Sequence, residues 1–548
     1  MHGRPSLISV AFWLTVAAVA TPLFLAHYLP FTDLPEHVAA MATMSRYFDA
    51  ASADARTYSI AFWRSQYLLY HGSGALLTRL TGDAVLANRL LLVAVGVALP
   101  LSVRSALRAL CKDDALAILA CMPFLSRPLF IGFLPYMSSM PLFFFGIAAV
   151  VRCAAKKERP ARVTAALAAL AMALLYTHLS IFVVFVPTAI TLTLILVAKD
   201  GAVTDVRVLL RDATRSVGWL FPACLMATVW SFAEKITIRS DSLWDPSEIG
   251  TMGLKRSLRA LPLWTFDTFR THSDEICGGL WWTVLAILAV VAARAAKKKA
   301  KIEPSTEAPS SVLRFVRRLD PSYVPLFCLL VVYFATPFRV GAGVMLNVRL
   351  APLVALSAIL TVGHVPRAPR NVLLALVTCV TMAYAANAAH EIRSLARNAD
   401  GLDEVLAAMR PEARLVTLSF ASNKTHAHFS PYSFPGSYYR ARGGTIAGYS
   451  FSDLSHWPVQ YRAEAKPPQK KVVHWTSAPC LYRHGVDGIF YDYVLVQDPK
   501  VDPFANEPSG PAMREVRRAG TFVLYEKTGG AWIGPDAIGG CAPPASSP

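Results

Sequence analysis

The stretch Phe31-Thr32-Asp33-Leu34-Pro35-Glu36-His37 lies directly after the first long apolar run of the chain. Pro35 suits the first turn of a helix, because its missing N–H would have no intrahelical partner there. A helix that begins near Thr32 or Asp33 would carry Asp33, Glu36 and His37 on one face. One interpretation is a helix start, with Asp33 as N-cap and Glu36 three residues later. The other is a functional site, and the two roles can coexist.

The composition predicts an α-helical polytopic membrane protein. Of the 548 residues, 54% are hydrophobic and only 16% are charged, and the mean hydropathy is +0.41. A soluble protein carries roughly 25% charged residues. Many apolar runs approach or exceed the ~18–20 residues that span a bilayer.

The net charge of +18 does not indicate a nucleic-acid partner, because most of it lies between the apolar runs. Residues 391–548 hold 17 Lys and Arg against 15 Asp and Glu, a net of +2, which leaves +16 for residues 1–390. Short basic clusters between apolar runs are typical of the cytoplasmic connections of membrane proteins. The strongest such cluster runs from Arg294 to Arg318.

The apolar runs predict about eleven transmembrane helices within residues 1–390. In this interpretation the basic connections face the cytoplasm, and loops 30–83 and 233–277 lie outside. Residues 58–80 are amphipathic and suit the membrane interface. The spans are expected at approximately 6–29, 84–103, 114–128, 131–151, 161–198 (two spans with a tight turn at 176–180), 216–232, 278–295, 322–338, 347–364 and 371–388.

From about residue 391 the composition is that of a soluble domain. Residues 391–530 are expected to form a small extracytoplasmic α/β domain, followed by a disordered tail at 531–548. Within this domain we expect a helix at 402–409 and strands at 414–420, 493–497 and 521–525. An oxidising compartment would permit a disulfide between Cys480 and Cys541.

The Asp33-Leu-Pro35-Glu-His37 motif, the tight turns and the spacing of the spans resemble the GT-C superfamily of membrane glycosyltransferases. The closer likeness is to uncharacterised bacterial multi-pass membrane proteins with an Asp-x-Pro-x-His loop. The resemblance implies a bundle of about a dozen helices, a catalytic acid in the first outer loop and an outer C-terminal domain. It also implies a sugar donor linked to polyprenyl phosphate. The chain lacks the Trp-Trp-Asp motif of oligosaccharyltransferases, so their acceptor is not implied.

An inverting transfer requires a carboxylate that orients or deprotonates the acceptor while the lipid phosphate leaves. Asp33 is the candidate for this role, with Glu36 as its partner or as a metal ligand. His37 is expected either to contact phosphate, to act as a second acid or base, or to lie on a helix surface. The phosphate must be neutralised by cationic side chains or by a divalent metal, Mg²⁺ or Mn²⁺.

Arginines in the outer turns are the candidates for binding the phosphate, because guanidinium groups make bidentate contacts with it. They are Arg127, Arg339 and Arg349, and the alternative is that each simply reaches the membrane interface. His178, in a tight turn between two spans, is either a substrate-binding residue or a hydrogen-bonded core histidine.

The C-terminal domain contains an aromatic and basic stretch that could stack on sugar rings and bind anions. It supplies Tyr439 and Arg440 as further candidate substrate-binding residues. The preceding His426-Ala-His428 pair lacks the partners that would complete a zinc site. Asn423-Lys-Thr425 fits the N-glycosylation pattern, which matters only in a eukaryotic lumen.

These observations lead to one favoured function and two alternatives. We expect an enzyme of the bacterial inner membrane that moves a sugar from a polyprenyl-phosphate carrier to a lipid, glycan or protein acceptor. Its partners would be membrane lipids and the lipid-linked sugar, and its C-terminal domain would be periplasmic. The alternatives are a transporter or flippase for an amphipathic substrate and a non-catalytic assembly protein. The phosphate-binding Gly-rich loop, Gly-x-Ser-x-Gly and His-Glu-x-x-His motifs are absent from the sequence, which argues against ATP-driven pumps and serine hydrolases.

Overall fold

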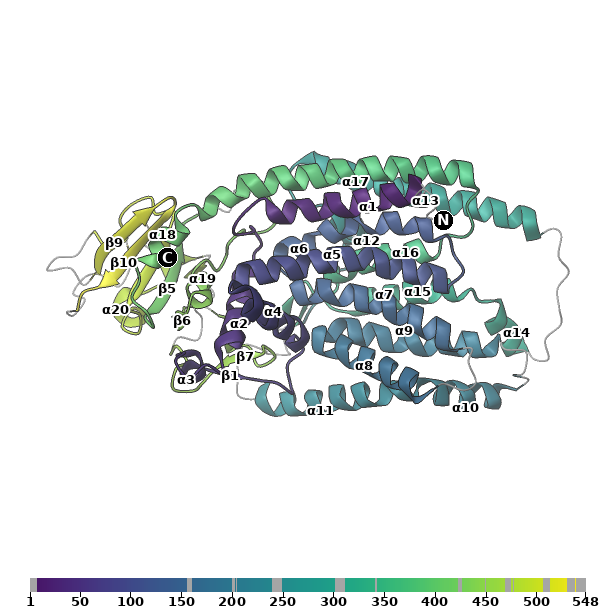
Figure 1. Ribbon diagram of the computed structural model, residues 1–548, viewed down its shortest axis with the longest axis horizontal. Coiled ribbons are helices and arrows are strands. Elements are labelled where there is room, and N and C mark those ends of the chain that lie inside the picture. The colour runs from purple at the N-terminus through teal and green to yellow at the C-terminus, as the bar shows by residue number, and fades with distance from the viewer. Residues whose placement is uncertain are drawn as a thin grey trace, which may run out of the picture. The chain divides into compact units, whose positions relative to one another are not determined.

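The computed structural model describes residues 7–154, 160–199, 203, 205–238, 249–300, 311–340, 343–421, 426–448, 450–468, 475–476, 478–505, 513–529 and 538. These residues form two compact units (Figure 1). Unit 1 comprises residues 1–24, 92–129 and 133–390, and unit 2 comprises residues 25–91, 130–132 and 391–548. The first outer loop and the C-terminal domain therefore belong to the same unit.

Unit 1 is a bundle of helices that lie side by side (Figure 1). Its α-helices are α1 (Leu7–Ala20), most of α5 (Ala84–Ala109), α6 (Arg127–Ile131), α7 (Leu134–Ala154), α8 (Ala161–Thr177), α9 (Leu179–Ala198), α10 (Val206–Val217), α11 (Phe221–Ile238), α12 (Leu254–Phe266), α13 (His272–Ala300), α14 (Ser311–Arg318), α15 (Val324–Ala335), α16 (Ala351–Leu360) and most of α17 (Arg367–Ala396). Short 3₁₀ helices join them: η1 (Thr21–Phe24), η2 (Asp114–Ala120), η3 (Met122–Leu125), η4 (Gly218–Leu220), η5 (Pro321–Tyr323) and η6 (Val348–Leu350).

Seven helical segments in the described part of the chain are long and apolar enough to cross a membrane, and three apolar helices are shorter. Residues 161–198 form two helices, α8 and α9, which are separated only by His178. Of the two expected spans, α9 is one of the seven long segments and α8 is one of the three shorter apolar helices. The expected span at 114–128 is less regular, because η2, η3 and α6 follow one another there. The predicted total of eleven spans stays a prediction.

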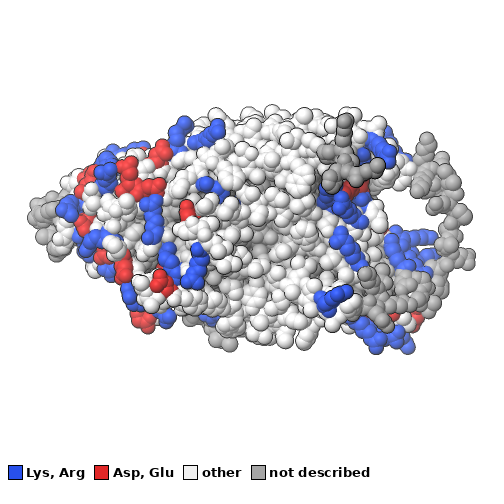
Figure 2. All heavy atoms as spheres, viewed as in Figure 1, with Lys and Arg blue, Asp and Glu red and all other residues white. Residues whose placement is uncertain are grey.

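Basic side chains gather at one end of the unit 1 bundle, and the long middle of its surface carries few charges (Figure 2). Hydrogen bonds join connections that are distant in sequence at this end. Arg370 at the start of α17 pairs with Asp113, and Lys112 pairs with Asp320. Arg317 of α14 donates to the carbonyl oxygen of Ala198 at the end of α9. These contacts show that the connections near residues 112–113, 198, 317–320 and 370 lie at the same end of the bundle.

Unit 1 also contains a three-stranded antiparallel sheet of order β2-β3-β4. Its strands are β2 (Ile249–Gly250), β3 (Arg339–Val340) and β4 (Gly343–Val344). Because Gly250 lies opposite Arg339, the second large loop and the turn that contains Arg339 are joined.

The C-terminal part of unit 2 is built on a five-stranded mixed sheet of order β6-β5-β8-β10-β9. The strands β6, β5 and β8 are parallel, and β10 runs antiparallel to β8 and β9. The predicted helix and three strands are confirmed to within a few residues. The bounds are α18 (Leu402–Ala407), β5 (Arg414–Ser419), β6 (Ile446–Ala447), β8 (Tyr493–Gln497), β9 (Met513–Ala519) and β10 (Phe522–Lys527), with η7 (Arg397–Ala399), α19 (Ser437–Ala441), η8 (Phe451–Asp453), η10 (Pro479–Leu481) and α20 (His484–Asp487) around them.

Residues 30–83, the loop that the sequence predicts to lie outside, fold into the same unit as this domain. The loop forms α2 (Leu34–Arg46), α3 (Asp54–Thr57), β1 (Tyr58–Ile60) and α4 (Leu68–Thr81). Strand β1 pairs antiparallel with β7 (Val459–Tyr461), so that Tyr58 lies opposite Tyr461. Helix α2 packs between α4 and α19, and all its residues from Leu34 to Ser45 are buried.

Some expectations concern residues outside the described part of the chain. These are the tail at 531–548 apart from Ile538, the Asn423-Lys-Thr425 pattern, Cys541, and parts of the 233–277 loop and of the 294–318 cluster. Cys480 is disulfide-bonded.

Candidate functional site

The Asp33–His37 motif forms the first turn of α2, as the sequence predicts. Asp33 occupies the N-cap position, and its carbonyl oxygen accepts hydrogen bonds from the amides of Glu36 (3.1 Å) and His37 (3.3 Å). Pro35 lies in the first turn of the helix, where its missing N–H costs no hydrogen bond. The capping interpretation is wrong in one respect: the Asp33 side chain makes no capping hydrogen bond. The Asp33 carboxylate therefore does not serve as a helix cap.

The segment 130–132 holds the backbone of Asp33. The amides of Thr32 and Asp33 donate to the carbonyl oxygens of Phe130 (3.0 Å) and Ile131 (3.1 Å). Gly132 has φ of +94°, and a Cβ atom there would lie 2.8 Å from Cβ of Asp33. Glycine is needed here for both its conformation and its lack of a side chain. The half-buried Asp33 is thus positioned by a tight backbone contact.

Glu36 is fully buried in unit 2, where its carboxylate accepts four hydrogen bonds. Oε2 accepts from Arg440 Nη1 (3.2 Å), from the Ser450 hydroxyl (2.9 Å) and from the Phe451 amide (2.8 Å). Oε1 accepts from the Ser437 hydroxyl. A buried carboxylate needs such partners to compensate for its lost hydration. The Glu36 side chain therefore joins α2 to α19 and to the turn that contains Ser450.

Arg440, the partner of Glu36, is also fully buried. Its guanidinium donates to the hydroxyls of Ser450 and Ser452 and lies over the Tyr58 ring, with Cζ 4.8 Å from the ring centroid. Burial raises the pKa of Tyr58 to about 12, so this ring stays neutral beside the ion pair. The neighbouring Tyr439 is buried as well and donates to the Arg410 carbonyl oxygen (2.8 Å). The substrate-binding roles predicted for Tyr439 and Arg440 stay predictions.

His37 lies against a second histidine, His71 of α4. The Nδ1 atom of His37 is 3.0 Å from Nε2 of His71, and the two rings stack with their centroids 5.1 Å apart. The outer nitrogens face carbonyl oxygens: His37 Nε2 is 2.9 Å from the oxygen of Gly132, and His71 Nδ1 is 2.9 Å from that of Tyr67. The Trp457 ring contacts both histidines. A chain of polar contacts therefore runs from Tyr67 through both rings to Gly132, which touches Asp33.

The histidine pair has three polar contacts but, when both rings are neutral, only two N–H groups. A third proton would complete the set of hydrogen bonds at the cost of a buried charge. Burial lowers the pKa of His71 to about 4. Burial and the proximity of His71 lower the pKa of His37 well below its usual value. Near neutral pH the pair is therefore neutral, with one of its three contacts lacking a hydrogen.

The other predicted binding residues belong to unit 1. Arg127 of α6 lies over the Trp264 ring (4.6 Å), with Nη1 3.7 Å from Asp267. Arg349 donates to the carbonyl oxygens of Met345 (3.1 Å) and Val344 (2.7 Å). Arg339 is exposed on β3.

His178 joins α8 to α9 through its backbone, because its amide bonds to Leu174 and its carbonyl oxygen accepts from Ile181 and Phe182. Its buried ring packs edge-on against Tyr136, with the ring centroids 5.4 Å apart. The backbone of His178 thus connects two helices and its ring packs in the core. Its role in substrate binding stays a prediction.

Sequence reasoning missed several residues that contact Asp33, Glu36 or His37. His71, Trp457 and Ser450 come from distant segments and carry no local motif. Gly132 had a weak signal, since an isolated glycine between apolar residues often marks a close backbone approach. Among the described residues, no group of three or more His, Cys, Asp or Glu side chains is arranged to hold a metal ion. Because the oxygens of Glu36 are already engaged, this residue does not fit the expected role of a metal ligand.

Comparison with known proteins identifies the fold. No protein-family model and no curated protein matches this sequence. Two crystal structures of ArnT from Cupriavidus metallidurans match it, one in the apo state and one bound to undecaprenyl phosphate. They are 10% identical to this chain, with TM-scores of 0.52 and 0.51. The matches cover 94% and 95% of this chain and 97% and 98% of the two ArnT chains.

These matches confirm the predicted fold. The chain has the fold of ArnT over nearly its whole length, and its described residues include a small C-terminal sheet domain. Together with the apolar helices, this fold makes the chain an integral membrane protein.

Proposed function

We propose that this protein is a GT-C-type glycosyltransferase that takes a sugar from a polyprenyl-phosphate carrier. The observation that supports the proposal is the ArnT-like fold over 94% of the chain, together with a crystal structure of that neighbour bound to undecaprenyl phosphate. In this proposal the acceptor is a lipid, glycan or protein on the extracytoplasmic face, and unit 2 lies on that face.

Asp33 is the proposed group that orients or deprotonates the acceptor. Two features of its surroundings favour this role. Its carboxylate is not used as a helix cap, and its backbone is held by the 130–132 segment. A carboxylate that must meet an acceptor in one orientation benefits from such a rigid support.

Glu36 and His37 act in this proposal as positioning residues. Glu36 fixes α2 through its four hydrogen bonds, and His37 contacts the carbonyl oxygen of the glycine that packs on Asp33. The donor phosphate is assigned to the arginines of unit 1, namely Arg127, Arg339 and Arg349. No step of the proposed reaction is routed through a metal ion.

The test uses the full-length protein reconstituted in liposomes with undecaprenyl-phosphate-linked pentoses and hexoses, each labelled in the sugar. Asp33→Asn removes the charge of the carboxylate but keeps the size of the side chain. We expect kcat for sugar transfer or release to fall by about 10²-fold or more, while the KM for the donor changes little. The control is Asp49→Asn, an exposed aspartate in the same loop, which should retain full activity.

Two outcomes would reject the proposal. The first is full transfer by Asp33→Asn, which would remove the catalytic role of Asp33. The second is counterflow of the lipid-linked sugar across the liposome membrane without covalent transfer by the unmodified protein, which would favour a transporter or flippase.

A further inference from the structure

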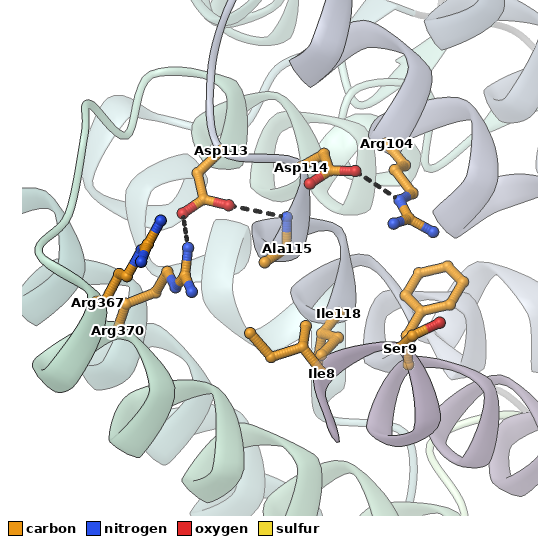
Figure 3. A pocket seen from close by; sticks show the side chains of 10 residues that line it. Ile8, Ser9, Arg104, Asp113, Asp114, Ala115, Ile118, Arg367 and Arg370 are labelled. Atoms are coloured by element: carbon orange, nitrogen blue, oxygen red, sulfur yellow. Dashed lines mark hydrogen bonds and ion pairs between the residues drawn. The ribbon is translucent and has the colours of Figure 1, made fainter. Parts of the chain in front are cut away.

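A cavity of about 360 Å³ lies at the basic end of unit 1. All its lining residues belong to unit 1, whereas Asp33, Glu36 and His37 belong to unit 2. The cavity is bounded by α1, by the end of α5, by the start of η2 and by the first turn of α17 (Figure 3). All these elements begin or end here, and all four belong to helical segments that are apolar enough to cross a membrane. The cavity is therefore placed at the level of a membrane surface.

Two ion pairs form the polar wall of the cavity. Arg370 Nη1 lies 2.6 Å from Asp113 Oδ2, and both side chains are largely buried. Arg104 Nε lies 2.9 Å from Asp114 Oδ2. Figure 3 shows these pairs side by side on one wall. Because each aspartate is already paired, the carboxylates hold the guanidinium groups in fixed orientations.

The cationic charge at this wall is not fully compensated. Arg367, the first residue of α17, lines the cavity and has no hydrogen bond or ion pair with any described residue. The lining residues include three arginines and two aspartates, a net charge of +1. Arg108 does not line the cavity but shares Asp114 with Arg104, which adds further positive charge nearby. The positive end of the α17 dipole adds to this charge.

The opposite wall of the cavity is mainly apolar, with Ser9 of α1 as its polar member. Ile8 and Phe12 of α1 and Ile118 of η2 line it. On the same two helices that bound the cavity, Leu7 of α1 is 89% exposed and Val372 of α17 is 69% exposed. A ligand that fits this cavity therefore carries an anionic group at one end and is continuous with hydrocarbon at the other.

We propose that this cavity binds the phosphate of an anionic glycerophospholipid from the membrane leaflet on the basic side. Arg367 and Arg370 contact the phosphate, and the acyl chains leave between α1 and α17 along Leu7 and Val372. Basic pockets between transmembrane helices are suited to such headgroups. This site is separate from the proposed glycosyl transfer and would exist whether or not that function is correct.

The test is native mass spectrometry of the full-length protein, released from detergent micelles after exchange with phosphatidylglycerol or with zwitterionic phosphatidylcholine. We expect the unmodified protein to retain phosphatidylglycerol at least fivefold more than phosphatidylcholine. Arg367→Gln leaves both ion pairs intact and should reduce the retained phosphatidylglycerol about fivefold. Ile8→Trp fills the apolar wall without changing the charge and should have the same effect.

Two matched controls separate a built site from general attraction to a basic surface. Arg211→Gln removes an exposed arginine of α10, and Arg393→Gln removes an exposed arginine near the other end of α17. Both should retain phosphatidylglycerol as the unmodified protein does. Equal losses in Arg211→Gln and Arg367→Gln, or an Ile8→Trp variant that binds normally, would overturn the proposal. Displacement of the lipid by inorganic phosphate alone at millimolar concentration would also overturn it, because the acyl chains would then contribute nothing.

Discussion

Glu36 and Arg440 form an ion pair with an N–O distance of 3.2 Å, and both side chains are inaccessible to solvent. They lie 404 positions apart in the sequence, one in the first outer loop and the other in the C-terminal domain. The pair explains why these two segments form a single compact unit. It also means that the loop that carries Asp33 depends on the C-terminal domain for its position.

Glu36→Gln should destabilise unit 2 strongly, because it leaves the Arg440 guanidinium buried without a counter-charge. We expect a loss of roughly 3–5 kcal/mol in the free energy of unfolding, measured by thermal or denaturant unfolding in detergent. The matched control is Glu412→Gln, which breaks the exposed pair with Arg56 and should cost less than about 1 kcal/mol. Similar losses in the free energy of unfolding for the two variants would show that the buried ion pair stabilises the protein no more than the exposed one.

Lowering the pH should destabilise the protein through the His37–His71 pair. The pKa of His71 is about 4 in the folded protein and near 6.5 in the unfolded chain, so the unfolded chain binds more protons between these values. The free energy of unfolding should therefore fall as the pH decreases from about 6.5 to 4, by up to roughly 3 kcal/mol. The measurement is the melting temperature in detergent as a function of pH.

The variant His71→Gln should lose most of this pH dependence, whereas His272→Gln should keep it, because the His272 side chain is 92% exposed. An unchanged pH profile in His71→Gln would contradict the assignment to the histidine pair.

Gly132→Ala should reduce catalysis by displacing Asp33. The new methyl group would lie 2.8 Å from Cβ of Asp33, so the backbone at one of the two positions must shift. We expect kcat for sugar transfer to fall by about tenfold or more, since small displacements of a catalytic group are costly. Gly443→Ala is the control, because Gly443 also has a positive φ (+98°) but has open space around it. If both variants lose activity equally, backbone strain and not the contact with Asp33 is responsible.

Arg339→Gln should weaken use of the lipid-linked donor without affecting folding. Arg339 is exposed on a short strand, so Arg339→Gln changes a solvent-facing position and not the packed core. We expect the KM for the donor to rise severalfold at an unchanged melting temperature, as measured by steady-state kinetics in liposomes. Arg256→Gln, at an exposed position of α12 in the same outer loop region, should leave the KM unchanged. An Arg339→Gln variant with a normal KM would remove this residue from the proposed phosphate site.

The sequence by itself determined the membrane class and the main strands of the C-terminal sheet, whereas the side on which the basic connections lie stays a prediction. These features follow from local composition, because the length of an apolar run and the alternation of a strand are properties of neighbouring residues. The start of α2 could be predicted in the same way, from Pro35 and the residues around it.

Only the tertiary structure decided what the side chains of that motif contact. Glu36 is the buried partner of Arg440, and His37 lies against His71 and Gly132. The cavity beside Arg367 likewise needs three segments that are distant in sequence. The physical reason is that the burial and pairing of charges depend on contacts between remote parts of the chain. Local sequence patterns do not predict such contacts. The catalytic role of Asp33 stays a proposal, and the structure adds that segment 130–132 holds its backbone in place.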